Sequence, residues 1–328
     1  MKSIMLRAAL AFTAAIAAQA ASAQDKSAPD SFPNRPIRWI IPYAPAGATD
    51  IVGRIVAQKL TERLSQHVVV DNRPGAGAII GSEILAKSAP DGYTMMSANI
   101  AHGANPYLHK KLPYDTVKDF APVTLMVVVP MVLIVHPSVP ARSVPEFVAL
   151  AKAKPGQLTY GTAGNGSANH LAMELFKVST GTNIIHIPYK GGGPAVVDLV
   201  AGQISAMFST VAMAAPYVKG GKLLAFGISS TKRSAALPDV PTVAETGISG
   251  AELHEWQGIV VSAGTPKAVI DTLHREVVAV LGVADVRERI AGLGADVAAS
   301  TPAQFAEHIR KELAIWGKVV KQSGIQAN

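Results

Sequence analysis

Residues 37–54 read IRWIIPYAPAGATDIVGR and contain the signals for a strand, a turn and the start of a helix. The apolar run Ile37–Ile41 stops at Pro42, and small residues lead to Thr49 or Asp50, either of which can cap a helix. The first N–H groups of a helix have no intrahelical acceptor and carry a partial positive charge, so they attract anions. The segment therefore predicts either one half of an anion-binding site or an ordinary capped turn.

A second segment repeats this pattern later in the chain. Residues 158–161 have strand character, the loop 162–166 reads TAGNG, and a helical pattern runs from Ser167 to Thr180. A chain of 328 residues also exceeds the usual size of a single compact core. We therefore expect two lobes that each contribute one such turn.

The composition excludes several classes of protein. Charged residues make up 16% and apolar residues 49% of the chain, a balance that is typical of a folded protein rather than a disordered one. The net charge is +7, but the densest basic segment, His109–Lys111, is short and has no interleaved aromatic residues, so we expect no nucleic-acid partner. The chain contains no cysteine, which excludes disulfides and thiolate metal sites.

The N-terminal segment has the layout of a secretory signal peptide. Lys2 and Arg7 precede an apolar run at 8–18, and Ala21-Ser22-Ala23 forms a small-residue cleavage site. The run is too short to span a bilayer. We expect export to remove residues 1–23 and to leave a soluble periplasmic protein, which is not a lipoprotein because no cysteine follows the cleavage site.

The first half of the mature chain alternates strand and helix patterns. Turns follow the expected strands at 44–49, 72–77 and 97–102, and the carboxyl ends of parallel strands share one edge of a sheet. We expect these turns to meet at one cleft, with residues 99–106 as a polar loop.

The rest of the chain repeats the alternation and ends in helices. A long apolar run at 123–136 predicts a strand that crosses between the lobes, and 158–229 again alternates strands and helices. Residues 238–258 contain turn residues and read as irregular. Three helical patterns follow, at 266–281, 286–293 and 302–321.

The familiar catalytic and cofactor motifs are missing. The segment GNGSAN around Ser167 lacks the glycine positions of a nucleophile elbow, and His170 follows on the same helix without an orienting carboxylate. No metal-binding histidine spacing, P-loop or dinucleotide fingerprint occurs, so we expect no metal and no cofactor. An exported serine hydrolase that uses Ser167 remains an alternative to a non-enzymatic binding protein.

The residues left for function suit recognition of a carboxylate. The helix starts near Thr49 and Ser167 supply backbone N–H donors, and Lys190 can add positive charge. Tyr43 and Tyr189 flank the two turns, where the rings either close over an apolar ligand body or cover the edge of the sheet.

Motifs along the whole mature chain resemble one family. They are NRPI at 34–37, PAGATDIV at 45–52, VDNRPGAG at 70–77, PDGYT at 90–94, YGT at 160–162, Gly164 with Gly166, IPYKG at 187–191, PTVAE at 241–245 and AGTP at 263–266. From about Pro33 to Ile325 the chain resembles the extracytoplasmic solute receptors of tripartite tricarboxylate transporters, the Bug or TctC-type family.

The resemblance implies an α/β, type II-like periplasmic binding protein fold. Each of its two lobes would be a mostly parallel sheet flanked by helices, with the ligand cleft between them. It implies a receptor without enzymatic activity that delivers a di- or tricarboxylate, an amino acid or an aromatic acid to integral membrane transporter subunits. A sensor subunit of a signalling system would share this fold and ligand and remains a second alternative.

The expected lobes and site residues follow from the same resemblance. We expect a monomer with lobe 1 at 24–128 and 251–328, lobe 2 at 129–250, and a hinge in the crossing segments. The expected ligand contacts, including Asn99 and Lys190 from the residue pattern, are Tyr43, Pro45, Ala46, Gly47, Thr49, Asp50, Asn99, Gly161, Thr162, Gly164, Gly166, Ser167, Asn169, Tyr189 and Lys190.

Two positions depart from the family pattern. Ala46 replaces a glycine of the first turn, which narrows or tilts that loop. Ser209-Thr210 stands where the family commonly has Asp-Asn. If these residues border the pocket, the loss of that acid makes a second anionic group on the ligand easier to accept.

Overall fold

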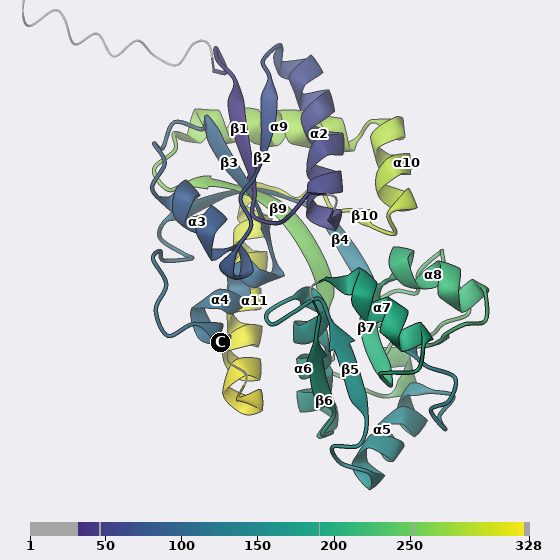
Figure 1. The fold of residues 1–328 in the computed structure, drawn as a ribbon. Coiled ribbons are helices and arrows are strands. Elements are labelled where there is room, and N and C mark those ends of the chain that lie inside the picture. Colours follow the sequence, from purple (N-terminus) through teal and green to yellow (C-terminus); the bar gives the residue numbers. More distant parts are fainter. Residues whose placement is uncertain (1–31, 46, 190, 252, 325–328) are drawn as a thin grey trace, which may run out of the picture. The chain divides into compact units, whose positions relative to one another are not determined.

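The computed structural model describes residues 32–45, 47–189, 191–251 and 253–324, so the expected signal peptide at 1–23 lies outside the described residues. From Arg35 onward the described chain forms one compact unit. Figure 1 shows two groups of strands in this unit, each flanked by helices. The unit therefore has two lobes, as the sequence predicts.

The first lobe contains three parallel strands, β1 (Ile37–Ile41), β2 (Val68–Asn72) and β3 (Thr94–Asn99), with β1 in the middle. Helix α2 (Ala48–Leu64) connects β1 to β2, and α3 (Ile79–Ala86) lies between β2 and β3. Trp39 on β1 is fully buried and donates from Nε1 to Ser97 Oγ on β3 over 3.0 Å. The turn between β1 and α2 therefore begins at a strand that is fixed to its neighbour β3.

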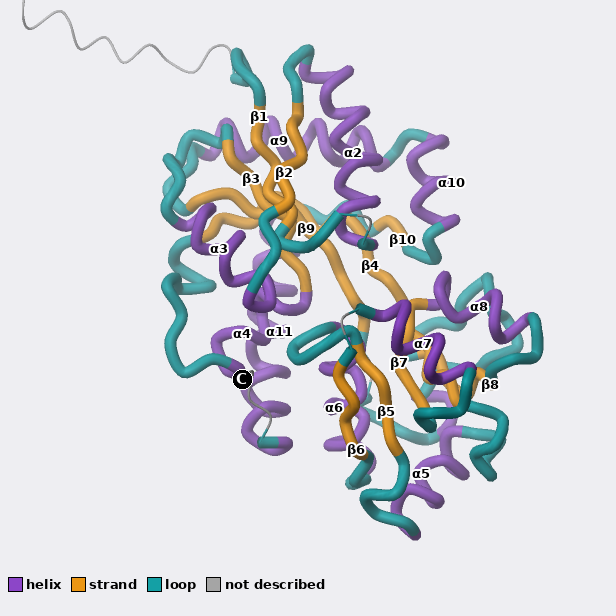
Figure 2. Tube along the Cα trace, in the orientation of Figure 1, coloured by secondary structure: helices purple, strands orange, loops and turns teal. Residues whose placement is uncertain are grey.

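A single long strand, β4 (Phe120–Val135), belongs to both lobes. Up to Pro130 it pairs antiparallel with β9 (His254–Ser262), and from Met131 onward with β7 (Ala206–Thr210) and β8 (Leu224–Ile228). Figure 2 shows β4 running from one group of strands to the other. The prediction of a crossing strand at 123–136 is confirmed.

Strand β9 corrects the expectation that residues 238–258 are irregular throughout. It fills the position between β3 and β4, pairs with both, and has Trp256 fully buried. Gly258 favoured the prediction of a turn in this segment. In the structure the glycine leaves space for the Phe305 ring, because a Cβ at this position would lie 2.2 Å from Cζ of Phe305. A glycine inside a strand often marks such a close approach.

The second lobe repeats the arrangement of the first. Strand β5 (Thr159–Thr162) runs parallel to β6 (Ile185–Pro188) and to β7, while β7 pairs antiparallel with β4. Its helices are α5 (Val144–Ala153), α6 (Ala168–Thr180), α7 (Gly192–Val200) and α8 (Val211–Lys219). Helix α8 is not predicted from the sequence. Each lobe thus has three parallel strands, to which β9 and β4 add antiparallel pairing in the first lobe and β4 and β8 in the second.

The C-terminal helices are α9 (Lys267–Leu281), α10 (Ala284–Gly292) and α11 (Pro302–Ser323), with the short strand β10 (Asp296–Val297) pairing with β4. Helices α9 and α10 pack against α2, whereas α11 contacts α4 (Ile100–Leu108), β4 and also α6 of the second lobe. Among the described residues, none of the helices combines the length and the apolar character needed to cross a membrane.

The two segments that cross between the lobes are joined through Ser229, which is buried. Its hydroxyl donates to the carbonyl of Leu253 and accepts from the N–H of Met131 over 3.1 Å. Its backbone N–H donates to the Met131 carbonyl over 2.7 Å. One serine therefore links β4 to the segment that leads into β9.

Candidate functional site

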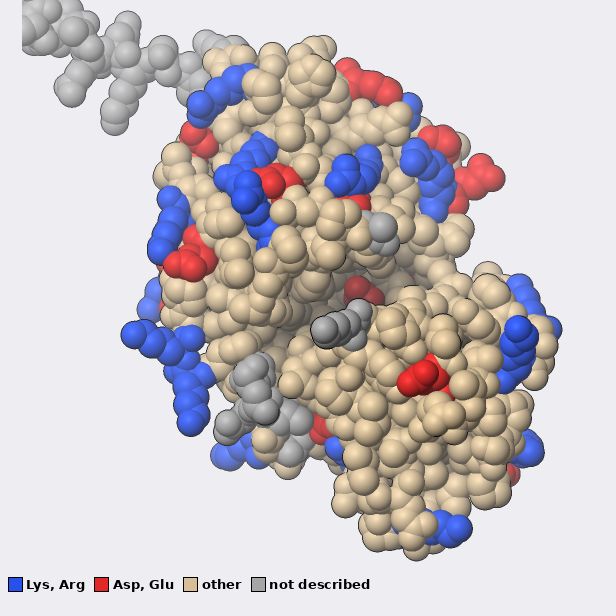
Figure 3. All heavy atoms as spheres, in the orientation of Figure 1, with Lys and Arg blue, Asp and Glu red and all other residues tan. Residues whose placement is uncertain are grey.

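A cavity of about 620 Å³ lies between the turns of the two lobes. In Figure 3 the surface is hollowed between the lobes; acidic atoms are visible inside the hollow, and lysine and arginine side chains lie on the outer surfaces in this view. Gly47 and Gly166 line the same cavity. Its described lining comprises Pro42, Tyr43, Ala44, Pro45, Gly47, Ala48, Thr49, Pro74, Gly75, Gly77, Ala78, Asn99, Ile100, Ala101, Ala163, Asn165, Gly166, Ser167, Ala168, Asn169, Gly191 and Glu255.

The first-lobe wall includes the start of α2. The helix begins at Ala48 with Gly47 as its N-cap residue, and no side chain caps it. The prediction that Thr49 or Asp50 caps this helix is wrong, because both residues lie inside its first turn. Since no side chain occupies the first N–H groups, the helix start keeps donors for an anion in the cavity.

Asp50 supports the first turn instead of facing the cavity. Its side chain is buried and accepts from Arg54 Nε over 2.9 Å and from Asn72 Nδ2 over 2.9 Å. Asn72 also donates to the carbonyl of Tyr43 over 3.0 Å. This network holds the turn in place and pairs the charge of Asp50 within the protein.

Asn99 connects the first turn to α4. Residues 99–106 are not the expected polar loop, because β3 leads directly into α4 and Asn99 is its N-cap residue. Asn99 Oδ1 accepts from the N–H of Ala101 over 3.1 Å and from the Tyr43 hydroxyl over 2.7 Å. Burial raises the pKa of Tyr43, so its hydroxyl remains protonated and keeps donating at neutral pH.

The second-lobe wall is the start of α6, where Ser167 is the N-cap residue. The Ser167 hydroxyl accepts from the N–H of His170 and donates to the carbonyl of Gly164 over 2.6 Å. His170 Nδ1 accepts from the N–H of Gly166 over 3.1 Å, so the ring supports the loop from behind. Gly166 adopts the left-handed conformation with φ of 73°, which glycine tolerates best.

A stack of rings lies beneath this loop. His170 and His186 are parallel with centroids 4.2 Å apart, and Tyr160 stacks on His186 at 4.9 Å. His186 Nε2 lies 2.6 Å from Oγ1 of Thr162, which in turn accepts from the N–H of Gly164 over 3.2 Å. Burial lowers the pKa of His186 to about 4, so the stack is uncharged at neutral pH.

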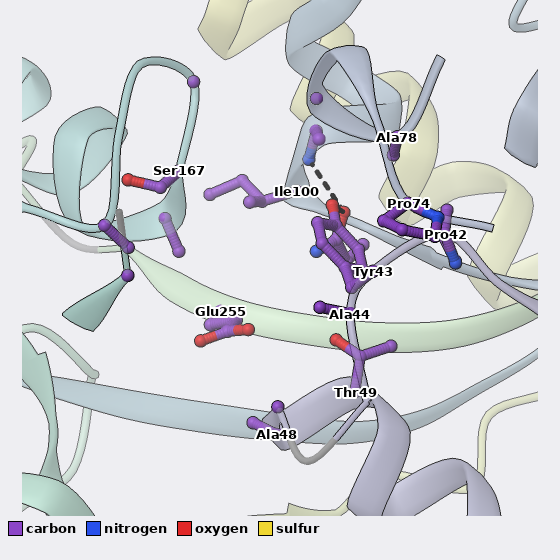
Figure 4. Close-up of a pocket in the computed structure, with 18 of the residues that line it drawn as sticks. Pro42, Tyr43, Ala44, Ala48, Thr49, Pro74, Ala78, Ile100, Ser167 and Glu255 are labelled. Carbon is purple, nitrogen blue, oxygen red and sulfur yellow. Dashed lines mark hydrogen bonds between the residues drawn. The ribbon is translucent and has the colours of Figure 1, made fainter. Parts of the chain in front are cut away.

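Glu255 is a cavity residue that the sequence analysis missed. It lies on β9, and Figure 4 shows it between Ser167 on one side and Ala44 and Thr49 on the other. Its side chain is only partly exposed, and burial raises the pKa of its carboxyl to about 7. Reading His254–Ser262 as a strand would have placed Glu255 and Gln257 together on one face.

The expected contacts fall into three groups. Residues that line the cavity are Tyr43, Pro45, Gly47, Thr49, Asn99, Gly166, Ser167 and Asn169. Residues outside its described lining are Asp50, Gly161, Thr162, Gly164 and Tyr189. Ala46 and Lys190 lie outside the described residues.

The residues outside the lining have other contacts. A Cβ on Gly161 would lie 2.4 Å from Cδ1 of Ile204, so this glycine allows close packing within the second lobe. The Tyr189 hydroxyl donates to Asp198 over 2.8 Å, and burial, with Asp198 beside it, raises its pKa to about 12. Ser209 and Thr210 are also absent from the described lining.

Two α/β lobes joined by crossing strands, with one cavity between their turns, define the class of extracytoplasmic solute-binding proteins. A sequence model of the family described as "Tripartite tricarboxylate transporter family receptor" matches residues 52–325. The chain belongs to this family of periplasmic receptors.

Similar proteins include one relative known by sequence and two solved structures. The chain is 38% identical to Protein BugT of Bordetella pertussis over 299 residues, which cover 90% of this chain and 91% of BugT. It is 32% identical to R. palustris Rpa4515 with adipate, with a TM-score of 0.80 over 90% of this chain and 99% of that one. For MatC (Rpa3494) from Rhodopseudomonas palustris with bound malate, the identity is 32% and the TM-score 0.78, over 88% and 100% of the two chains.

Proposed function

We propose that this protein captures a small organic carboxylate between its two lobes in the periplasm and delivers it to integral membrane subunits of a tripartite tricarboxylate-type transporter. The observation that carries the proposal is the pair of helix starts, at Gly47 and Ser167, that line one cavity from opposite lobes. Helix N-termini favour anions. The similar structures with adipate and malate also hold carboxylates.

The ligand contacts in this proposal come from the residues that line the cavity. Main-chain N–H groups at Ala48, Thr49 and Ala168 would bind the carboxylate, and the Tyr43 ring would cover its apolar part. The residues of the expected set outside the lining would act through the turns: Asp50 holds the first turn, and Thr162 and Gly164 hold the second.

The protein acts as a receptor and not as a hydrolase in this proposal. The Ser167 hydroxyl bonds to Gly164 and to the backbone of His170, while the His170 ring accepts from Gly166. A nucleophilic serine needs a base within hydrogen-bond reach, and this arrangement does not give Ser167 one. An ester-hydrolysis assay checks this point: turnover that Ser167→Ala abolishes would contradict the receptor proposal.

We assign the lobes to 24–128 with 251–328 and to 129–250, in a monomer. The change of partner in β4 between Pro130 and Met131 and the start of β9 at His254 support these boundaries. The hinge would then lie where Ser229 links the crossing segments.

Calorimetry with adipate, malate and other small carboxylates tests the proposal. We expect at least one to bind and, at about 100 times its dissociation constant, to stabilise the protein by roughly 2.7 kcal/mol. Ser167→Ala should weaken binding several-fold. No binding by any carboxylate would overturn the proposal.

Ser143→Ala is the matched control for Ser167→Ala. Ser143 also caps a helix by accepting from the third backbone N–H, at the start of α5, but it is outside the described cavity lining. Each substitution should cost about 1 kcal/mol of stability through the lost cap. Only Ser167→Ala should change the affinity.

A further inference from the structure

Glu255 is the one charged side chain in the described lining of the cavity. The other described residues of the lining are apolar or neutral and include no lysine, arginine or histidine. A receptor for a carboxylate would gain nothing from a negative charge at this position unless the ligand also carried a group that the charge attracts. The chemistry of Glu255 therefore bears on the class of ligand.

Within the described part of the chain, the Glu255 carboxyl group has no hydrogen-bond or ion-pair partner. The charge of Glu255 acts on the nearby Tyr43, but the Tyr43 hydroxyl donates its hydrogen bond to Asn99 and not to Glu255. A partly buried carboxylate without a partner is costly, because it loses water and gains nothing in return. The buried acid Asp50, by contrast, is paired with Arg54 and Asn72.

The position of Glu255 leaves room for a ligand with two ends. Its side chain lies between the start of α6 and the first turn (Figure 4), in a cavity of about 620 Å³. Small-molecule sites typically measure about 300–1,000 Å³. A carboxylate at the helix starts and a second polar group at Glu255 can therefore occupy the cavity together.

We propose that Glu255 selects ligands that join a carboxylate to a cationic nitrogen, as in an amino acid, with the ammonium group paired to the Glu255 carboxylate. The proposal rests on the proposed function and narrows it. An ammonium group supplies the donors that the described residues do not give this carboxylate, and charge-assisted hydrogen bonds are the stronger kind. This proposal is opposite to the expectation drawn from Ser209-Thr210, that a second anionic group is easier to accept, because Glu255 places an acid inside the cavity.

The pair 6-aminohexanoate and adipate tests this directly, because the two compounds have similar length and differ in one terminal group. Affinities are measured by calorimetry at about pH 8, where the Glu255 carboxyl is ionised. The pair 4-aminobutanoate and succinate extends the comparison to shorter ligands. We expect the amino compound of at least one pair to bind more tightly than its diacid.

The variant Glu255→Gln keeps the shape of the side chain and removes its charge. It should weaken binding of the amino compound by about tenfold or more and strengthen binding of the diacid. Glu288→Gln is the matched control, because Glu288 is exposed on α10 and lies outside the described cavity lining. It should leave all affinities unchanged.

The outcomes separate this inference from the proposed function. If diacids bind and Glu255→Gln leaves the preference between diacid and amino compound unchanged, the inference fails and the receptor function stands. A diacid preferred by the unaltered protein and weakened by Glu255→Gln would mean that a neutral Glu255 donates to a second carboxylate, which also overturns the inference. If no compound of either kind binds, both proposals fail.

Discussion

The partly buried carboxyl group of Glu255 makes the stability of the protein without ligand depend on pH. Burial raises the pKa of Glu255 from its ordinary value of 4.5 to about 7. Between these two values the Glu255 carboxyl is therefore protonated more often in the folded protein than in the unfolded chain. The contribution of Glu255 to stability falls as the pH rises through this window, and the loss is complete above about pH 7.

Glu255→Gln should remove this loss in the absence of ligand. We expect the free energy of unfolding of the variant to exceed that of the parent at pH 8. This excess should be about 2 kcal/mol smaller at pH 5, after allowance for the partial exposure of Glu255. Urea denaturation at the two pH values measures it. An equal effect at both pH values would show that the charge of Glu255 is not penalised.

The sequence allowed the turn residues of the site to be predicted but not its acid. Gly47, Gly166 and Ser167 were recognisable because small residues before a helix start have a local signature. Glu255 has no such local signature. Its position in the cavity depends on the pairing of β9 with β3 and β4, two strands that lie far from β9 in the sequence. Asp50 was misjudged for the same reason, because its partner Asn72 comes from another strand.

At the level of elements, most helices and strands follow from periodicity, and the exceptions have identifiable causes. The long apolar run of β4 and the helical stripes of α9 and α11 are local patterns. The start of strand β9 is hard to predict because Gly258 and the polar residues His254, Glu255 and Gln257 interrupt its apolar character. The packing of Phe305 on Gly258 explains the glycine, and a contact of that kind is not visible in the sequence of either segment.

Gly258→Ala should therefore destabilise the protein. The added methyl group would overlap the Phe305 ring and force the α11 start away from β9, at a cost of about 1–3 kcal/mol. Gly292→Ala is the control, because a Cβ on Gly292, at the end of α10, meets no atom within 4 Å. Thermal unfolding should show a lower midpoint for Gly258→Ala alone; equal midpoints would contradict this packing.

Ser229→Ala tests the link between the crossing segments. The substitution leaves the buried Met131 N–H and Leu253 carbonyl without the hydroxyl, which should cost about 1–3 kcal/mol. Ser249→Ala, at an exposed position of the same connection, should be neutral. We also expect Ser229→Ala to change ligand affinity, because the link lies at the proposed hinge. Unchanged stability and affinity would show that this serine does not hold the crossing.

At the scale of the whole described unit, the two lobes share β4, and α11 contacts both α4 and α6. Motions of the lobes should therefore be limited rotations about the crossing segments. Small-angle scattering should show a smaller radius of gyration when a bound carboxylate is present than when it is absent. A radius that stays constant at saturating ligand would argue for a cavity that is preformed in its closed state.

The path of the chain through the sheets also constrains the order of folding. β5–β8, with their helices, come from one continuous segment, so their contacts can form as soon as that segment is available. β3 and β4 are separated by β9, which arrives much later in the sequence. Closing such long loops is entropically costly and slow. A chain that emerges from its N-terminus first should therefore complete its second lobe before its first, because β1, β2 and β3 can be joined to β4 only after β9, in the last third of the polypeptide, is available.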